Sequence, residues 1–212
     1  PLKLKDAAKS LTELGIPVLL VNPESPDQLS DMISLIATAT NTQDKADQLL
    51  DFINQEKEML TTSLATADGT PNIYLAGNSS LLSTAGPAMY QSGIIELAGG
   101  KNVASDISDT YWAEISYEQL LSWNPDYIIL ASDAEYTVDD VLSDPNLKDC
   151  TAVKNNHVYA IPGDIEALDS PVPASILASI WLAGILHPDQ VSTDTYTKEM
   201  NSFYETFYGI KK

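Results

Sequence analysis

Residues 116–131, SYEQLLSWNPDYIILA, decide the fold class. The first half predicts a short helix, because Ser116 and Gln119 have the Ser-x-x-Gln spacing of a capping box. The second half, from Tyr127 to Ala131, is a continuous apolar run that is typical of a buried strand. A helix followed by a buried strand is the unit from which α/β proteins with largely parallel sheets are built.

The same alternation extends in both directions from this stretch, so we expect an α/β fold with a mostly parallel sheet flanked by helices. Most of the predicted helices have an apolar face, a capping residue or a terminal glycine. They cover residues 6–14, 26–36, 44–66, 87–97, 116–122, 172–186 and 196–207. The predicted strands cover residues 16–21, 72–76, 103–104, 127–131 and 157–161.

The longest helical signal predicts a domain boundary. Apolar residues recur at spacings of three, four and seven between Asp44 and Thr66, which would form a rod about 34 Å long. The sequence DGTP that follows would end this helix. We therefore expect a first α/β segment over residues 1–43, the long helix over 44–67 and a second α/β lobe over 68–212.

The charge of the chain excludes several classes of function. Acidic residues number 30 and basic residues 11, giving a formal net charge of −19, and every basic residue is a lysine. Such a surface would repel nucleic acids and anionic lipids. It suits a cationic ligand or a partner protein with a basic face.

The sequence says little about the cellular compartment in which the protein acts. The single cysteine, Cys150, excludes an intramolecular disulfide and is expected to be a semi-buried small residue. The opening residues PLKLKDAAKS do not have the pattern of a signal peptide. The longest apolar run, residues 174–186, would span about 20 Å as a helix, which is shorter than a bilayer core, so we expect a buried helix.

Candidate ligand-binding residues follow the predicted strands. Ligands of open α/β sheets bind beyond the carboxyl ends of the strands, which nominates the loops 22–26, 77–86, 132–136 and 162–171. The adjacent aromatic residues Tyr111 and Trp112 are expected in another loop, where the tryptophan either fills the core or lines a pocket. The polar, acidic and aromatic candidates are Asn78, Ser79, Tyr111, Trp112, Asp133, Glu166 and Asp169.

Catalysis is poorly supported by the sequence. Neither His157 nor His187 lies beside a recognisable nucleophile, and no Gly-x-Ser-x-Gly motif is present. Asp164, Glu166 and Asp169 fall in one loop, where a carboxylate-dependent hydrolase or a cation site is an alternative to a solvated acidic rim. A non-catalytic α/β interaction domain is a further alternative.

Five segments, taken together and in order, resemble one family: LGIPVLLVNPESPDQL, LAGGKNVASD, EISYEQLLSWNPDYIIL, AVKNNHVYAIPGD and DSPVPASILASIWLAGILHPDQ. This family is the substrate-binding protein of ABC importers for iron-siderophore, haem, cobalamin and related metal complexes, in which one rigid helix joins two lobes. The resemblance implies that residues 44–67 are the interlobe helix. It also implies that residues 1–43 are the remnant of an N-terminal lobe most of which this chain lacks.

The resemblance further implies a role in transport, without catalysis, a cofactor or a resident metal. A chelated iron or cobalt complex would bind in a cleft lined by the loops 77–86, 111–112, 133–136 and 164–171. Glu118 matches the family's docking glutamate, which pairs with arginines of the permease. The protein would act outside the cytoplasm, in the periplasm or as a cell-surface lipoprotein whose lipid anchor lies outside this chain.

Overall fold

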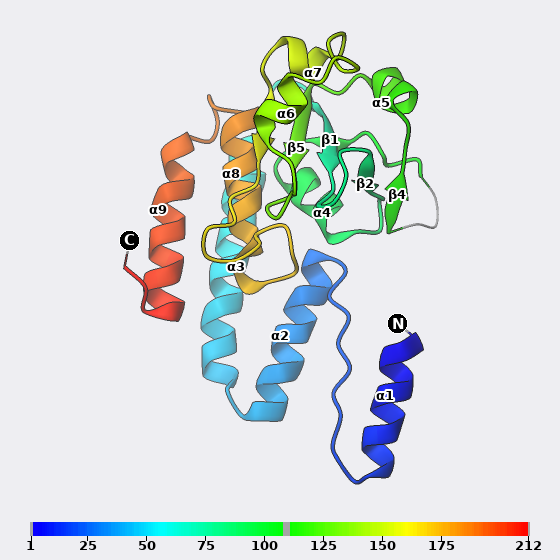
Figure 1. Cartoon of the computed structure of the whole chain (residues 1–212). Helices are drawn as coiled ribbons and strands as arrows, with labels where there is room; N and C mark the ends of the chain where they lie inside the picture. The colour runs from blue at the N-terminus through cyan, green and yellow to red at the C-terminus, as the bar shows by residue number, and fades with distance from the viewer. Residues whose placement is uncertain (1, 108–110, 212) are drawn as a thin grey trace.

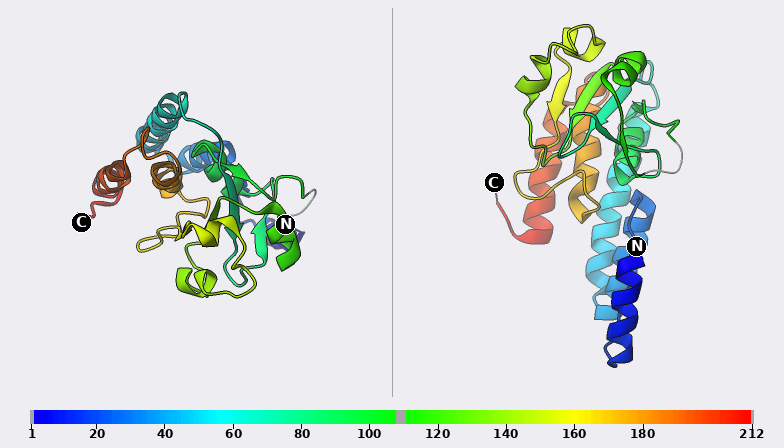
Figure 2. Two further views of the ribbon diagram at one scale, coloured as in Figure 1. Left: turned by 90° about the horizontal axis from the view of Figure 1, so that it is seen from above. Right: turned by 45° about the vertical axis from the view of Figure 1, so that its right-hand side comes forward.

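The computed structural model describes residues 2–107 and 111–211. A mixed sheet with helices on both faces forms one end of the molecule, and three helices from the first third of the chain extend away from it (Figures 1 and 2). These are α1 (Leu2–Glu13), α2 (Pro26–Thr40) and α3 (Gln43–Leu64). The predicted α/β class is confirmed.

The centre of the sheet is parallel. Strand β1 (Asn72–Ala76) pairs in parallel with β5 (Tyr127–Leu130) and β3 (Lys101–Asn102), and β5 pairs in parallel with β6 (Val158–Ala160). One edge is antiparallel, since β2 (Ser83–Ala85) pairs with β1 and with β4 (Trp112–Glu114). The order is β4-β2-β1-β5-β6, with β3 beside the start of β1.

The strands bury both faces, which explains their continuous apolar runs. Successive side chains of a strand point to opposite faces. Accordingly, Ile73 and Leu75 belong to one core cluster, whereas Tyr74 and Ala76 belong to another. The sequence pattern of residues 72–76 and 127–131 therefore predicts a sheet enclosed between two layers of helices, as observed.

The helices divide between the two faces. The larger core cluster joins one face to α2, α3, α4 (Tyr90–Leu97) and α8 (Ile176–Leu186). The smaller cluster joins the other face to α5 (Tyr117–Trp123), α6 (Val138–Leu142) and α7 (Thr151–Lys154). Helix α9 (Thr193–Phe203) packs beside α8 and continues into a π-helical turn, Tyr204–Tyr208.

The long helix and the apolar helix agree with the sequence predictions. Helix α3 has 22 residues, and its buried face consists of Ala46, Ile53, Glu56 and Leu60. Helix α8 is buried on almost every side and is preceded by a 3-10 turn, Pro173–Ser175. No helix within residues 2–107 and 111–211 is both long enough and apolar enough to cross a membrane.

The strand predicted over residues 16–21 is wrong. After α1 ends and Gly15 turns the chain with a φ of 77°, the segment runs as irregular backbone with four exposed apolar side chains. A strand needs neighbouring backbone to accept and donate its hydrogen bonds. In the described part of the chain the sheet lies around β1 and β5, and no strand lies beside residues 16–21. The exposed side chains are Ile16, Leu19, Leu20 and Val21.

Three smaller predictions also require correction. The strand expected at 103–104 is formed instead by Lys101–Asn102, where the Asn102 side chain donates to Ala85 O and Ser92 Oγ. Trp112 begins β4 instead of lying in a loop. Cys150 is fully buried at the start of α7, beside the small core cluster.

Candidate functional site

Gly77, immediately after β1, is the point at which the candidate loops meet. Its N–H donates to Ser83 O at 2.7 Å, and its carbonyl accepts from the Tyr136 hydroxyl at 2.6 Å. A Cβ at this position would lie 2.9 Å from Cζ3 of Trp112, which is closer than carbon atoms pack. Only glycine allows the indole ring to approach the backbone this closely, so residue 77 fixes the position of Trp112.

The predicted loops 77–86 and 132–136 lie together, as the strand-end rule predicts. They are joined by the bond from Glu135 N–H to Asn78 O, 2.8 Å long, as well as by Tyr136. Asn78, Ser79 and Asp133 are all exposed. The loops thus present an amide, a hydroxyl and a carboxylate to solvent at one edge of the sheet.

Two aromatic side chains lie at the same edge. Trp112 pairs in register with Ala85 and keeps 41% of its surface exposed, and Tyr111 keeps 49%. Of the two alternatives for Trp112, filling the core or lining a pocket, its exposure excludes the first. A partly exposed indole held against a glycine is suited to packing against a ligand.

The acidic loop 162–171 behaves differently from the other loops. Asp169 is only 4% exposed and accepts a hydrogen bond of 2.5 Å from Ser132 Oγ. Glu166 accepts a hydrogen bond of 3.0 Å from the Tyr204 hydroxyl, at the end of α9. Both carboxylates are therefore engaged by protein hydroxyls. This pairing argues for structural roles rather than direct contact with a ligand.

The same arrangement weakens the hydrolase alternative. Asp164 and Glu166 line one small pocket against Tyr196 and Tyr204, whereas Asp169 lies outside that pocket beside Ser132. An acid pair for hydrolysis needs two carboxylates facing one substrate site. Asp164 and Glu166 do share a pocket, but Glu166 is already hydrogen-bonded to the Tyr204 hydroxyl in its wall, and Asp169 is bound to Ser132 outside it.

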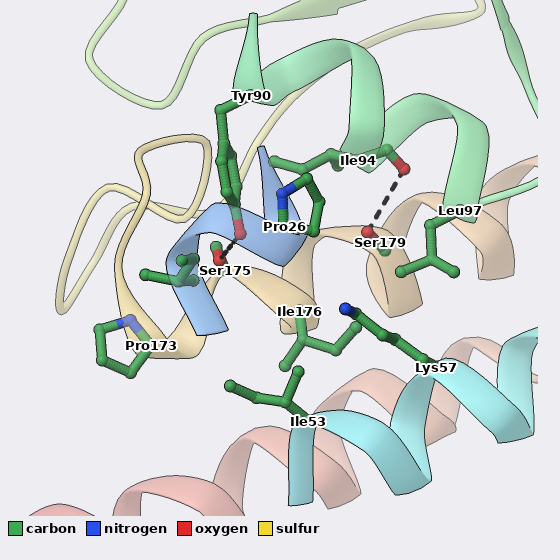
Figure 3. A pocket seen from close by; sticks show the side chains of 11 residues that line it. Pro26, Ile53, Lys57, Tyr90, Ile94, Leu97, Pro173, Ser175, Ile176 and Ser179 are labelled. Atoms are coloured by element: carbon green, nitrogen blue, oxygen red, sulfur yellow. Dashed lines mark hydrogen bonds between the residues drawn. The ribbon is translucent and has the colours of Figure 1, made fainter. Parts of the chain in front are cut away.

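The fourth candidate loop, 22–26, follows no strand and packs against the sheet lobe. Pro26 lies in a small crevice between α2, α3, α4 and the turn before α8 (Figure 3). The Tyr90 hydroxyl and Ser175 Oγ are 2.6 Å apart on one wall, and Ser179 Oγ donates to Ile94 O at 3.3 Å (Figure 3). A mostly apolar lining with its polar groups already paired makes this crevice a packing contact between helices.

The electrostatics of the site are uniformly negative. The four candidate loops and Tyr111-Trp112 contain no lysine, arginine or histidine, and they contain six carboxylates, counting Glu24. The two histidines lie elsewhere: His157 stacks on Tyr127 with centroids 4.5 Å apart, and His187 is buried with Nε2 3.2 Å from Gly99 O. No group of three potential metal-ligating side chains gathers within the described residues.

Glu118 lies apart from these loops, in the first turn of α5. Ser116 caps this helix by accepting from the Gln119 N–H at 3.2 Å, and the buried Leu120 attaches it to the sheet. The backbone N–H of Glu118 itself, followed by the Ser116 hydroxyl, holds the pKa of its carboxyl below the usual range. A fully exposed, ionised carboxylate is thus held on a short helix whose position is fixed by packing.

Sequence reasoning did not single out four residues that build the site: Gly77, Ser132, Tyr136 and Tyr204. Gly77 had a usable signal, since a glycine directly after a strand often marks a close approach of other atoms to the backbone. Tyr136 and Tyr204 act through contacts with residues 59 and 38 positions away, respectively, which no local pattern indicates.

A largely parallel sheet with polar and aromatic groups gathered beyond its strand ends is the arrangement in which open α/β proteins bind small ligands. The sequence pattern of the family described as "Periplasmic binding protein" matches residues 2–165. The chain belongs to this family.

Individual relatives support the same assignment. The molybdate-binding protein MolA of Haemophilus influenzae is 26% identical over 223 residues, covering 94% of this chain and 63% of the relative. A vitamin B12-binding protein of Salmonella choleraesuis is 31% identical over 124 residues, covering 58% of this chain and 46% of the relative. A crystal structure of a periplasmic solute-binding protein from Veillonella parvula superposes with a TM-score of 0.84, at 25% identity, over 98% of this chain and 64% of that one. The chain thus spans less than two thirds of the length of each of these proteins.

Proposed function

We propose that this chain is part of the solute-binding component of an ABC importer. It would capture a small metal complex outside the cytoplasm and deliver it to the permease, a role in which no bond is made or broken. The observation that carries the proposal is the cluster around Gly77 in a member of the periplasmic binding protein family. In this proposal one wall of the cleft consists of Asn78, Ser79, Tyr111, Trp112 and Asp133.

The domain arrangement belongs to the same proposal. Residues 68–212 would form the ligand-binding lobe, α3 the interlobe helix, and residues 1–43 part of the first lobe. Helix α3 supports this because it is long, and its buried face packs against α2 on one side and α8 on the other. An interlobe helix that packs against elements of both segments would limit cleft closure to small angles.

The charge of the proposed cleft wall restricts the chemical class of the cargo. The ligands in the names of two relatives differ widely: one is molybdate, a free oxyanion, and the other is vitamin B12, a large corrinoid. An oxyanion needs cationic or N–H donors, and the candidate loops carry carboxylates and no cationic side chain. We therefore propose that this lobe favours a neutral or cationic complex, of the cobalamin or ferric hydroxamate type, over a free oxyanion.

Isothermal titration calorimetry and tryptophan fluorescence test the proposal. The compounds are cyanocobalamin, a ferric trihydroxamate, haem and molybdate. We expect one of the metal complexes to bind and to quench fluorescence through Trp112. The quench should be lost in Trp112→Phe and kept in Trp181→Phe, which removes a partly buried tryptophan of α8. Absence of binding for all four compounds would contradict the proposal, and tighter binding of molybdate would contradict the cargo class.

Docking on the permease is assigned to Glu118 in this proposal. A carboxylate held exposed and ionised at a helix start can accept two parallel N–H···O hydrogen bonds from the guanidinium of an arginine on a partner. Glu118→Ala should leave cargo affinity unchanged and weaken binding to the permease. The measurement is co-purification of the protein with its permease in detergent.

A further inference from the structure

The first half of the loop 162–171 is held in place by side chains rather than by its backbone. Within the described ranges, residues 162–166 take part in no backbone–backbone hydrogen bond, whereas Ser170 N–H donates to Ala167 O in the second half. The second half is further fixed by the buried Leu168 and by Asp169, which accepts from Ser132. The only hydrogen bond to residues 162–166 in that part of the chain joins Glu166 to Tyr204.

Tyr204 is itself fixed by packing. Its side chain is 3% exposed, and its ring meets Phe203 edge-on at a centroid distance of 5.3 Å and Tyr208 at 5.5 Å. Burial, and next the hydrogen bond with Glu166, raise the pKa of the Tyr204 hydroxyl, so it remains a donor at every physiological pH. A hydroxyl on a buried, closely packed ring is a well-defined anchor for a carboxylate.

The π-helical turn places this anchor. Helix α9 changes from α-helical to π-helical geometry at Tyr204, and the turn closes with Ile210 N–H donating to Tyr204 O at 3.0 Å. Turns with π-helical geometry are rare in proteins, and a large share of those that do occur lie at functional sites. Phe203, the preceding residue, packs against Phe52 of α3 at 5.3 Å, so the anchor is attached to the long helix as well as to α9.

We propose that Tyr204 is a positioning residue for cargo binding, whose hydroxyl holds Glu166 and with it the loop 162–171 at the wall of the cleft. The inference rests on the proposed function, because that proposal supplies the cleft and its cargo. The effect of the Tyr204–Glu166 hydrogen bond on the loop can nevertheless be tested without any cargo. It assigns Glu166 to anchoring the loop instead of contacting the ligand. In Figure 1 the loop, in gold, lies between α9 and the end of the sheet lobe that faces α2.

Limited proteolysis of the cargo-free chain with a broad-specificity protease, read by mass spectrometry for first cuts within residues 162–168, tests the inference. Tyr204→Phe removes the hydroxyl and keeps the ring, and should accelerate cleavage of this loop about tenfold while first cuts in α8 and β5 stay as slow as in the wild type. Glu166→Gln retains an oxygen acceptor and should be cut nearly as slowly as the wild type, whereas Glu166→Ala should be cut as fast as Tyr204→Phe. Tyr208→Phe, a neighbouring and more exposed tyrosine, is the matched control and should be cut like the wild type.

The outcomes separate the inference from the proposed function. Unchanged cleavage of the loop in Tyr204→Phe, or equal acceleration in Tyr208→Phe, would overturn the positioning role. Acceleration spread over the whole lobe would overturn it too, because it would indicate a general loss of stability. If the loop loosens as expected but the wild type binds none of the four compounds, the anchor stands and the transport proposal fails.

Discussion

Replacing Glu56 with glutamine should stabilise the protein at neutral and alkaline pH. Glu56 lies on the buried face of α3 and is 8% exposed. Burial, followed by the nearby Glu199 carboxylate, raises its pKa from 4.5 to about 7, with Lys198 acting in the opposite direction. Phe52 of α3 packs against Phe203 of α9. Phe52 lies one helical turn before Glu56, and Phe203 lies one turn after Glu199, so Glu56 faces α9 beside this aromatic contact.

The sign and size of the effect follow from linkage. A pKa that is higher in the folded than in the unfolded state means that the folded protein holds the proton more tightly. The contribution of Glu56 to the free energy of unfolding therefore falls as pH rises from about 4.5 through about 7 and is constant beyond. At 1.36 kcal/mol per pH unit, the upper limit is about 3.4 kcal/mol. We expect about 1–2 kcal/mol, because the carboxylate keeps some access to water at the edge of the helix contact.

Urea unfolding of the wild type and Glu56→Gln at pH 4.5, 6 and 8 measures this effect. The two proteins should have similar stability at pH 4.5, where the folded glutamate is protonated. The variant should gain stability progressively toward pH 8. Glu58→Gln, an exposed position two residues along the same helix, is the control and should show no such trend. A Glu56→Gln effect that is equal at all three pH values, or destabilising at pH 8, would refute the reasoning.

Three further predictions concern packing and docking. Gly77→Ala should destabilise the protein by about 1–3 kcal/mol and shift tryptophan emission, because its Cβ would lie 2.9 Å from the Trp112 ring; unchanged emission would contradict the contact. Phe203→Ala should cost about 3–5 kcal/mol in urea unfolding, since the side chain is fully buried among aromatic rings; a loss below 1 kcal/mol would show that α9 contributes little. Glu118→Arg should abolish cargo uptake by cells while leaving cargo affinity unchanged. Glu58→Arg, the control, should leave both uptake and affinity unchanged, and normal uptake in Glu118→Arg would remove the docking role.

The fold was predictable where a single element carries its own signal. The apolar run at 127–131, the cap at Ser116 and the periodic face of α3 each specify local structure without help from distant residues. The antiparallel edge was missed because β2 consists of Ser83, Thr84 and Ala85, three small residues with no strand pattern. These residues are stabilised by pairing with β1 and with β4 about 30 residues away.

The candidate site was predictable only in part, for a similar reason. The rule that ligands lie beyond strand ends located Asn78, Ser79 and Asp133, because it depends on chain order alone. The acidic residues Glu166 and Asp169 share that location, but partners distant in sequence determine what they contact. The error at residues 16–21 has the same origin, because an apolar run specifies a strand only when neighbouring strands are present.

Helix α3 also has a mechanical consequence. It contains neither glycine nor proline, the usual causes of a kink, and it is flanked by residues with positive φ, Asn41 at 56° and Gly69 at 79°. In the proposed two-lobed protein such a helix would move as one stiff unit, with bending confined to two pivots in the connections at its ends. With a length of about 33 Å, a tilt of roughly 5° displaces its far end by about 3 Å. Substitutions at these two pivots should therefore alter the amplitude of movement, whereas substitutions on the exposed middle of the helix should not.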